Sequence, residues 1–223
     1  MSGEIMNGAR HGAELALPAW YGKLPGAGDF VGRRMPGALA RTWEQWLSQG
    51  MAAGRARLEA HAPLWSFAIP AGSGDGWVQL GCVAPSCDRV GRRYPLVVAQ
   101  PIAPAGAVRD RAHEGRGADA RSALAGADVR IRLMSAIVRD AIRSALGPED
   151  FDMALAQGIQ YDAGAPAAAG GWPNLWEYFD PNGMTSFWWT DAGDGAPRTD
   201  VHTGGLDAAL FERLFGEPGG ART

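Results

Sequence analysis

Residues 185–190 read Thr-Ser-Phe-Trp-Trp-Thr, and this short segment decides the fold class. Its β-branched and aromatic residues favour a β-strand. Neighbouring side chains of a strand point to opposite faces of the sheet, so Trp188 and Trp189 are both buried only if both faces are covered. The segment therefore predicts a sheet with helices on each side, in three layers.

Other segments have the patterns of strands and helices. Leu96-Val-Val-Ala99 is a continuous apolar run, which is typical of a strand buried on both faces. From Leu39 to Leu58 a stripe that contains Trp43 and Trp46 follows helical spacing and is expected to cover the sheet. We also expect strands at residues 20–24, 64–69, 77–84, 94–102 and 198–203, and helices at residues 127–146, 149–157, 174–179 and 206–215.

These elements predict a single α+β domain in which a central, mostly antiparallel sheet has helices on both faces. A chain of 223 residues with 46% hydrophobic residues is long enough to bury one good core. We expect the domain at residues 18–217. Residues 1–17 are polar and glycine-containing and predict a disordered N-terminal tail, and residues 218–223 predict a short C-terminal tail.

Composition excludes several classes of function. The net charge of -3 argues against the basic field that nucleic-acid binding requires. No apolar run approaches the ~20 residues of a transmembrane helix, so we expect a cytoplasmic protein. Cys82 and Cys87 are too few for a disulfide framework and are expected to be free thiols. The histidines are widely spaced, and we expect neither a metal site nor a cofactor.

Two loops that are built alike are the candidates for a functional site. In each, an aspartate in a turn precedes a pair of arginines, and neither loop contains a nucleophile with its base. A turn carboxylate accepts backbone hydrogen bonds and pairs with arginine, so a structural role and a partner-facing role both remain open. The candidate partner-binding residues are Asp29, Phe30, Arg33 and Arg34 in the first loop and Asp88, Arg89, Arg92 and Arg93 in the second.

An enzymatic use of these loops is the alternative hypothesis. Gly26-Ala-Gly-Asp29 has the glycines of a phosphate-binding turn but lacks the full GxGxxG and P-loop spacings. Ser86 and Asp88, together with His202, would supply the groups of a hydrolase triad, but Pro85-Ser-Cys87 is not a GxSxG elbow. A small hydrolase or a nucleotide-binding enzyme that uses Asp29, Ser86 and Asp88 is therefore the second interpretation.

Several longer motifs also occur in a fixed order along the chain. They are Trp20-Tyr-Gly-Lys-Leu-Pro25, Gly28-Asp-Phe-Val31 with Arg33-Arg34, Trp43 with Trp46-Leu47, Pro63-Leu-Trp65 with Phe67, Pro85-Ser-Cys-Asp-Arg-Val-Gly-Arg92, Tyr94-Pro-Leu96, Ser186-Phe-Trp-Trp-Thr190, and Gly205-Leu206 with Phe211 and Leu214. In this order the motifs resemble the TagF family of type VI secretion-associated proteins, which is also called ImpM. The resemblance extends from about Trp20 to Phe215.

The resemblance implies a function for the whole chain. It implies a cytoplasmic accessory regulator of the bacterial type VI secretion system that represses assembly or firing after translation. The implied partner is the forkhead-associated scaffold protein of that system. The resemblance carries over no catalytic residues, so we do not expect an enzyme. A structural subunit of a secretion assembly is a third hypothesis.

Overall fold

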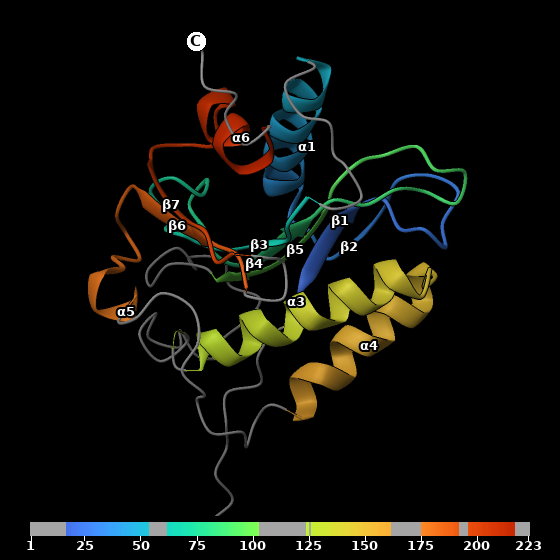
Figure 1. Cartoon of the computed structure of the whole chain (residues 1–223). Helices are drawn as coiled ribbons and strands as arrows, with labels where there is room; N and C mark the ends of the chain where they lie inside the picture. The colour runs from blue at the N-terminus through green and yellow to red at the C-terminus, as the bar shows by residue number, and fades with distance from the viewer. Residues whose placement is uncertain are drawn as a thin grey trace, which may run out of the picture.

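The centre of the fold is a seven-stranded sheet with the order β2-β1-β5-β4-β3-β6-β7. Every pair of neighbouring strands is antiparallel. Figure 1 shows the computed structural model, which describes residues 17–53, 62–102, 124, 126–161, 175–191 and 196–216. The strands are β1 (Ala19–Gly22), β2 (Val31–Arg33), β3 (Trp65–Ile69), β4 (Val78–Ala84), β5 (Leu96–Ile102), β6 (Thr185–Trp189) and β7 (Thr199–Thr203).

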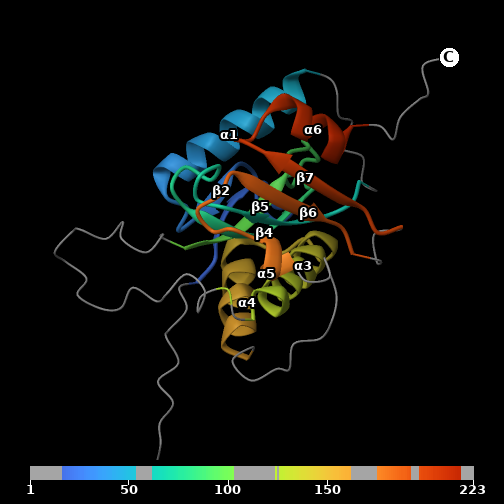
Figure 2. The ribbon, with the colours of Figure 1, turned by 90° about the vertical axis from the view of Figure 1, so that its left-hand side faces the viewer.

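Helices cover both faces of this sheet (Figures 1 and 2). α1 (Gly37–Ala52) and α6 (Ala208–Phe215) pack on one face, and α3 (Ala127–Arg143) and α4 (Pro148–Tyr161) lie on the other. The short α5 (Leu175–Tyr178) precedes β6 and adds Leu175 to the core on the α3 side. The expected three-layer α+β domain with an antiparallel sheet is confirmed.

The paired tryptophans of β6 divide between the two cores. Trp188 is fully buried among side chains of α1 and α6, whereas Trp189 belongs to the core under α3. The Trp188 ring lies 5.2 Å from that of Phe67, and its Nε1 donates a hydrogen bond to Ser186 Oγ at 2.9 Å. A buried indole therefore keeps a partner for its polar end. The sequence interpretation of residues 185–190 is confirmed.

The largest difference from the predicted elements is β2. Its three residues include Gly32 and Arg33, and this composition is typical of a loop rather than a strand. Pairing with β1 makes the segment a strand, with Trp20 opposite Arg33. Pairing with β1 has therefore overridden the local preference of these three residues for a loop.

The predicted helix over residues 39–58 is α1, which begins at Gly37; its predicted last residues lie outside the described part of the chain, as do residues 1–16 and 217–223. The tails and the domain bounds thus stay predictions. Among the described helices, none has the length and the apolar character that spanning a bilayer requires.

Candidate functional site

The two candidate loops lie side by side at one end of the sheet. β1 leads into the first loop and β5 follows the second, and these two strands are antiparallel neighbours. Hydrogen bonds join the loops directly: Ser86 Oγ donates to the Lys23 carbonyl (2.7 Å), the Arg89 N–H donates to the Ala27 carbonyl (2.7 Å), and Arg92 Nη2 donates to the Gly28 carbonyl (2.9 Å). The loops therefore form one unit.

Asp88 organises the second loop and is almost completely buried. Its Oδ2 accepts hydrogen bonds from Lys23 Nζ (3.0 Å) and Arg92 Nε (2.7 Å). Its Oδ1 accepts from the backbone N–H groups of Val90 (3.1 Å) and Arg92 (2.9 Å). Burial alone would raise the pKa of Asp88, but these hydrogen bonds and the Arg92 charge hold that pKa well below its usual range. Asp88 is therefore an ionised, fully paired carboxylate that shapes its own loop and ties it to Lys23.

Arg33 and Arg34 pair with acidic residues of α4. Arg33 Nη2 donates to Glu149 Oε1 at 2.9 Å, and Arg34 Nη1 donates to Asp152 Oδ2 at 3.0 Å. Arg34 Nη2 also contacts the second oxygen of the same carboxylate. These contacts join α4 to the β1–β2 hairpin. Arg33 and Arg34 therefore pair with α4, whereas Arg92 pairs with Asp88 of its own loop.

Asp152 is the shared acceptor in the contact with α4. Trp20 Nε1 donates to its Oδ1 at 2.9 Å, in addition to the bonds from Arg34. The hydrogen bond from Arg34 is the main reason why the pKa of Asp152 is lowered; partial burial opposes this shift, and the Trp20 hydrogen bond and the charges of Arg34 and Arg33 add to it.

We expect Asp152→Asn to lower the free energy of unfolding at pH 7 by about 1–2 kcal/mol, because an amide accepts weaker hydrogen bonds from a guanidinium. A carboxyl group with a lowered folded pKa stabilises fully above its unfolded pKa of about 3.9, and this contribution is lost as pH falls through the folded value. The difference between wild type and variant should therefore shrink below about pH 4 in urea unfolding experiments. Met153→Ala, at an exposed neighbour on α4, should keep the wild-type pH dependence. If the difference in the free energy of unfolding between wild type and Asp152→Asn stays constant down to acid pH, the pKa of Asp152 is not lowered by these contacts.

Phe30 and Val90 are the exposed apolar side chains of the joined loops, with 44% and 71% of their surfaces accessible. The Phe30 ring packs edge-on against Tyr94 at 4.6 Å and lies 5.0 Å from Lys23 Nζ. The ring is thus held in place although it is open to solvent. The other exposed side chains of the two loops are polar or charged. We name the exposed set the loop platform: Asp29, Phe30, Arg89, Val90, Arg92 and Arg93.

Asp29 plays a smaller part than Asp88 does. Its Oδ1 accepts a hydrogen bond from the Phe30 N–H at 2.8 Å, as in a local turn. The predicted pairing of this turn aspartate with a nearby arginine is not found within the described residues, where Arg33 and Arg34 reach α4 instead. The likeness of the two loops in sequence therefore does not extend to their geometry.

The groups of the hydrolase triad in the alternative hypothesis lie far apart. Ser86 is buried, and its hydroxyl already donates to the Lys23 carbonyl. His202 lies in β7 at one edge of the sheet, whereas Ser86 and Asp88 lie beside β1 and β5 near the other edge. His202 Nε2 lies 2.8 Å from the Gly205 carbonyl. Ser86, Asp88 and His202 therefore do not assemble into a catalytic triad.

Both cysteines are free thiols, in agreement with the expectation. Burial raises the pKa of the Cys82 thiol to about 12, so this thiol stays protonated near neutral pH. Across the described ranges, no three histidine, cysteine or acidic side chains are grouped so that they could hold a metal ion.

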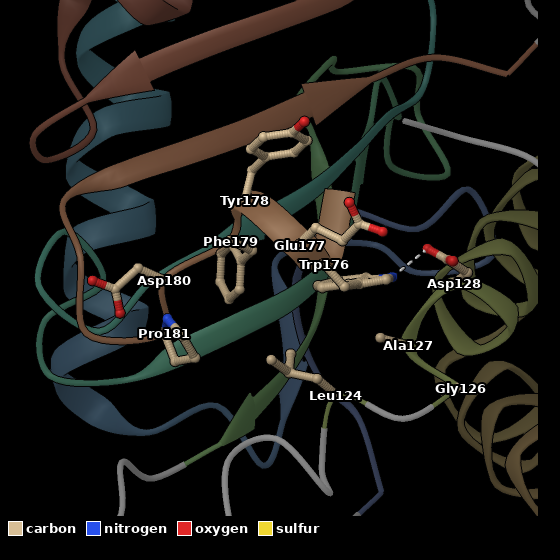
Figure 3. Close-up of a pocket in the computed structure, with 10 residues that line it drawn as sticks. All are labelled: Leu124, Gly126, Ala127, Asp128, Trp176, Glu177, Tyr178, Phe179, Asp180 and Pro181. Carbon is tan, nitrogen blue, oxygen red and sulfur yellow. Dashed lines mark hydrogen bonds between the residues drawn. The ribbon is translucent and has the colours of Figure 1, made fainter. Parts of the chain in front are cut away.

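A hollow of about 880 Å³ lies apart from the loop platform, between α5 and the start of α3 (Figure 3). Trp176 Nε1 donates to Asp128 Oδ1 at 2.9 Å across it. Its described lining includes carboxylates and aromatic rings but no serine, cysteine, histidine or lysine. The hollow has no signature in the sequence, because the two segments that form it are 48 positions apart. The lining residues are Leu124, Gly126, Ala127, Asp128, Trp176, Glu177, Tyr178, Phe179, Asp180 and Pro181.

Two further residues of the loop region, Lys23 and Asp152, were not among the candidates predicted from the sequence. Lys23 is the chain's only lysine, and in a chain that otherwise uses arginine this was a usable signal for a special environment. Asp152 gave no such signal, because it is 118 positions from Arg34 and stands in an ordinary acidic helix start. Only the packing of α4 beside β1 brings it to the arginines.

Comparisons with known proteins identify the family. The family model described as the TagF N-terminal domain, type VI secretion system-associated, matches residues 19–157, which include both loops and most of α4. The crystal structure of PA0076 from Pseudomonas aeruginosa PAO1 is similar, with 27% sequence identity and a TM-score of 0.63, and the match covers 92% of this chain and 97% of that one. None of the curated proteins matches. The family model spans more than half of the chain, and the chain therefore belongs to the TagF family of type VI secretion-associated proteins.

Proposed function

We propose that this chain is a cytoplasmic regulator that represses a type VI secretion system after translation, by binding its forkhead-associated scaffold protein. Membership in a type VI secretion-associated family supports an accessory role in that system. The observation that carries the binding hypothesis is the loop platform, which combines the exposed Phe30 and Val90 with exposed arginines on a hydrogen-bonded base. Aromatic and arginine side chains around an apolar centre are typical of energetically dominant contacts.

The candidate residues divide into two roles under this proposal. Phe30, Val90 and Arg89 are exposed and would contact the partner, with Asp29, Arg92 and Arg93 at the rim. Asp88 would act from beneath as a positioning residue, because it is buried.

Arg33 and Arg34 would also act by position. Both are only partly exposed and hold α4 against the hairpin through Glu149 and Asp152. Replacing these arginines would disturb the fold as well as binding, so they are poor probes of the interface. Substitution of the two exposed apolar residues, Phe30 and Val90, tests the interface more directly.

We expect the double variant Phe30→Ser, Val90→Ser to weaken binding of the purified scaffold protein at least about 100-fold, because two central contacts of a protein interface are lost. Isothermal titration calorimetry of the variant against the forkhead-associated protein of the same secretion system measures this effect. Val90 is well exposed, but Phe30 also packs on Tyr21 and Tyr94, so the variant should unfold at a lower temperature than wild type and still be folded at the temperature of the titration. A thermal unfolding curve of the variant checks this.

Met153→Ser is the matched control, because Met153 is an exposed apolar residue (52%) on α4, away from the loop platform. This control should bind the scaffold as wild type does. A folded double variant that binds with unchanged affinity would refute the assignment of the interface. Failure of the wild-type chain to bind the scaffold, together with stoichiometric co-purification with a baseplate or membrane complex, would favour the structural-subunit hypothesis instead.

A further inference from the structure

β7 is an edge strand whose side chains alternate between exposed and partly buried. In the part of the chain that the structure describes, it pairs with β6 alone (Figure 2). Thr199, Val201 and Thr203 are exposed, with Val201 at 47%, whereas Asp200 and His202 are partly buried on the α6 side of the sheet. Asp200 is held there by Arg213 of α6 at 2.8 and 3.0 Å. The exposed residues are β-branched, which favours strand pairing.

The hydrogen bonds to β6 define which backbone groups of β7 face outward. The Thr190 N–H donates to the Arg198 carbonyl at 3.0 Å, and the Gly204 N–H donates to the Met184 carbonyl at 2.9 Å. Both bonds continue the register of the β6–β7 pair, so residues 198, 200, 202 and 204 turn their backbone groups toward β6. The intervening residues then turn their N–H and C=O groups toward the free edge: Thr199, Val201 and Thr203.

The sequence of β7, Thr-Asp-Val-His-Thr, is complementary to itself in an antiparallel pair centred on Val201. Thr199 then faces Thr203 of the second copy in a hydrogen-bonded pair, and Val201 faces its own copy in another. Asp200 faces the second copy's His202 in the closer, non-hydrogen-bonded pair, which keeps the two Asp200 carboxylates from facing each other. We propose that this chain forms a two-fold homodimer through β7, which joins the two sheets into one.

Other registers are less favourable on the same grounds. An antiparallel pair centred on Asp200 would place two carboxylates face to face, and a pair centred on His202 would place two imidazoles face to face. Two carboxylates directly opposite each other repel, which disfavours the register centred on Asp200. Both registers also pair fewer residues than the register centred on Val201 does. Charge and hydrogen bonding therefore select the same arrangement.

The two edges of the sheet differ in a way that supports this choice. β2, at the opposite edge, has three residues and is followed by Arg34, whose φ of 59° lies in the left-handed region. Its arginines are engaged by α4. β7 has five residues and contains neither lysine nor proline, which are the residues that commonly protect an edge from pairing.

Analytical ultracentrifugation of the full chain and of charge-swapped variants tests the proposal. We expect the wild type to dimerise reversibly, and Val201→Lys and Val201→Glu each to raise the dimer dissociation constant about tenfold or more, because each places like charges on the two-fold axis. An equimolar mixture of the two variants should recover the dimer, since the introduced lysine then faces the introduced glutamate.

Met153→Lys is the matched control for an added charge at an exposed apolar position, and it should dimerise as wild type does. Circular dichroism checks that each variant is folded, which is expected because Val201 is exposed. A wild type that stays monomeric up to about 1 mM would overturn the proposal. Dimers that persist in both single variants, or a mixture that stays monomeric, would overturn it as well. The outcome is independent of scaffold binding, which concerns loops near the other edge of the sheet.

Discussion

Gly22→Ala is expected to lower the free energy of unfolding by about 3–5 kcal/mol, because the new methyl group has no space and the backbone is unsuited to it. Gly22 ends β1 with a φ of 140°, a conformation that side-chain-bearing residues rarely adopt. A Cβ at this position would lie 2.2 Å from the Pro95 carbonyl oxygen and 2.8 Å from the Leu96 Cα. Both are backbone atoms of the segment that enters β5, so no side-chain rotation relieves the clash. Urea unfolding of the variant measures the loss.

Gly147→Ala provides the control. Gly147 lies in the turn between α3 and α4, and a Cβ there would meet no atom within 4 Å. We expect this variant to stay within about 0.5 kcal/mol of wild type. If both variants lost the same free energy of unfolding, the close approach of the end of β1 to Pro95 would not contribute to stability. A selective loss at Gly22 would show that the two loops depend on the close contact between their supporting strands.

The architecture was predictable where a residue pattern has one physical solution. Trp188 next to Trp189 requires cover on both faces of a strand, and the run from Leu96 to Ala99 requires a central strand. β2 was missed for the opposite reason, since a strand of three residues that contains a glycine has no pattern of its own. It exists because β1 offers a free edge next to it.

The candidate site was predictable only in part. The charged loops stand out in the sequence, but their mutual contact follows from the adjacency of β1 and β5, and strand order is not encoded in either loop. The same reasoning explains Arg33 and Arg34. Asp29 precedes both arginines in the sequence and is a possible local partner, yet Arg33 and Arg34 pair with Asp152 of α4. Asp152 also accepts a hydrogen bond from Trp20. Long-range packing determined the pairing.

The two exposed apolar residues of the platform differed in how well the sequence predicted them. Phe30 was a sequence candidate, but Val90 was not, because a valine between charged residues has no distinctive pattern. Its exposure of 71% is a property of the folded chain and could not be read from the sequence. Burial, rather than residue type, also distinguishes Asp88 from Asp29, although both precede arginines in similar turns.

Lys23→Met is expected to lower the free energy of unfolding by about 2–4 kcal/mol, since a buried ammonium that hydrogen-bonds across the loops is lost. Methionine keeps much of the apolar stem, so the loss reports mainly on the charge and on the contact with the Phe30 ring. Arg143→Met is the matched control: Arg143 is 72% exposed in its ion pair with Asp140, and its loss should stay within about 0.5 kcal/mol. Scaffold binding should weaken in Lys23→Met as well, because the platform loses its base.

A double-mutant cycle with Asp88→Asn isolates the contact between the loops. If Lys23 stabilises the fold through Asp88, the Lys23→Met variant keeps a buried Asp88 carboxylate that has lost one of its partners. Asp88→Asn should then cost less stability in this variant than it does in the wild type. The double variant should therefore lose less stability than the sum of the two single losses. Additive losses in urea unfolding would mean that the two residues act independently, and that Arg92 and the backbone N–H groups alone satisfy the carboxylate. In that case the loops would be joined by their backbone hydrogen bonds, and the platform would tolerate loss of the lysine.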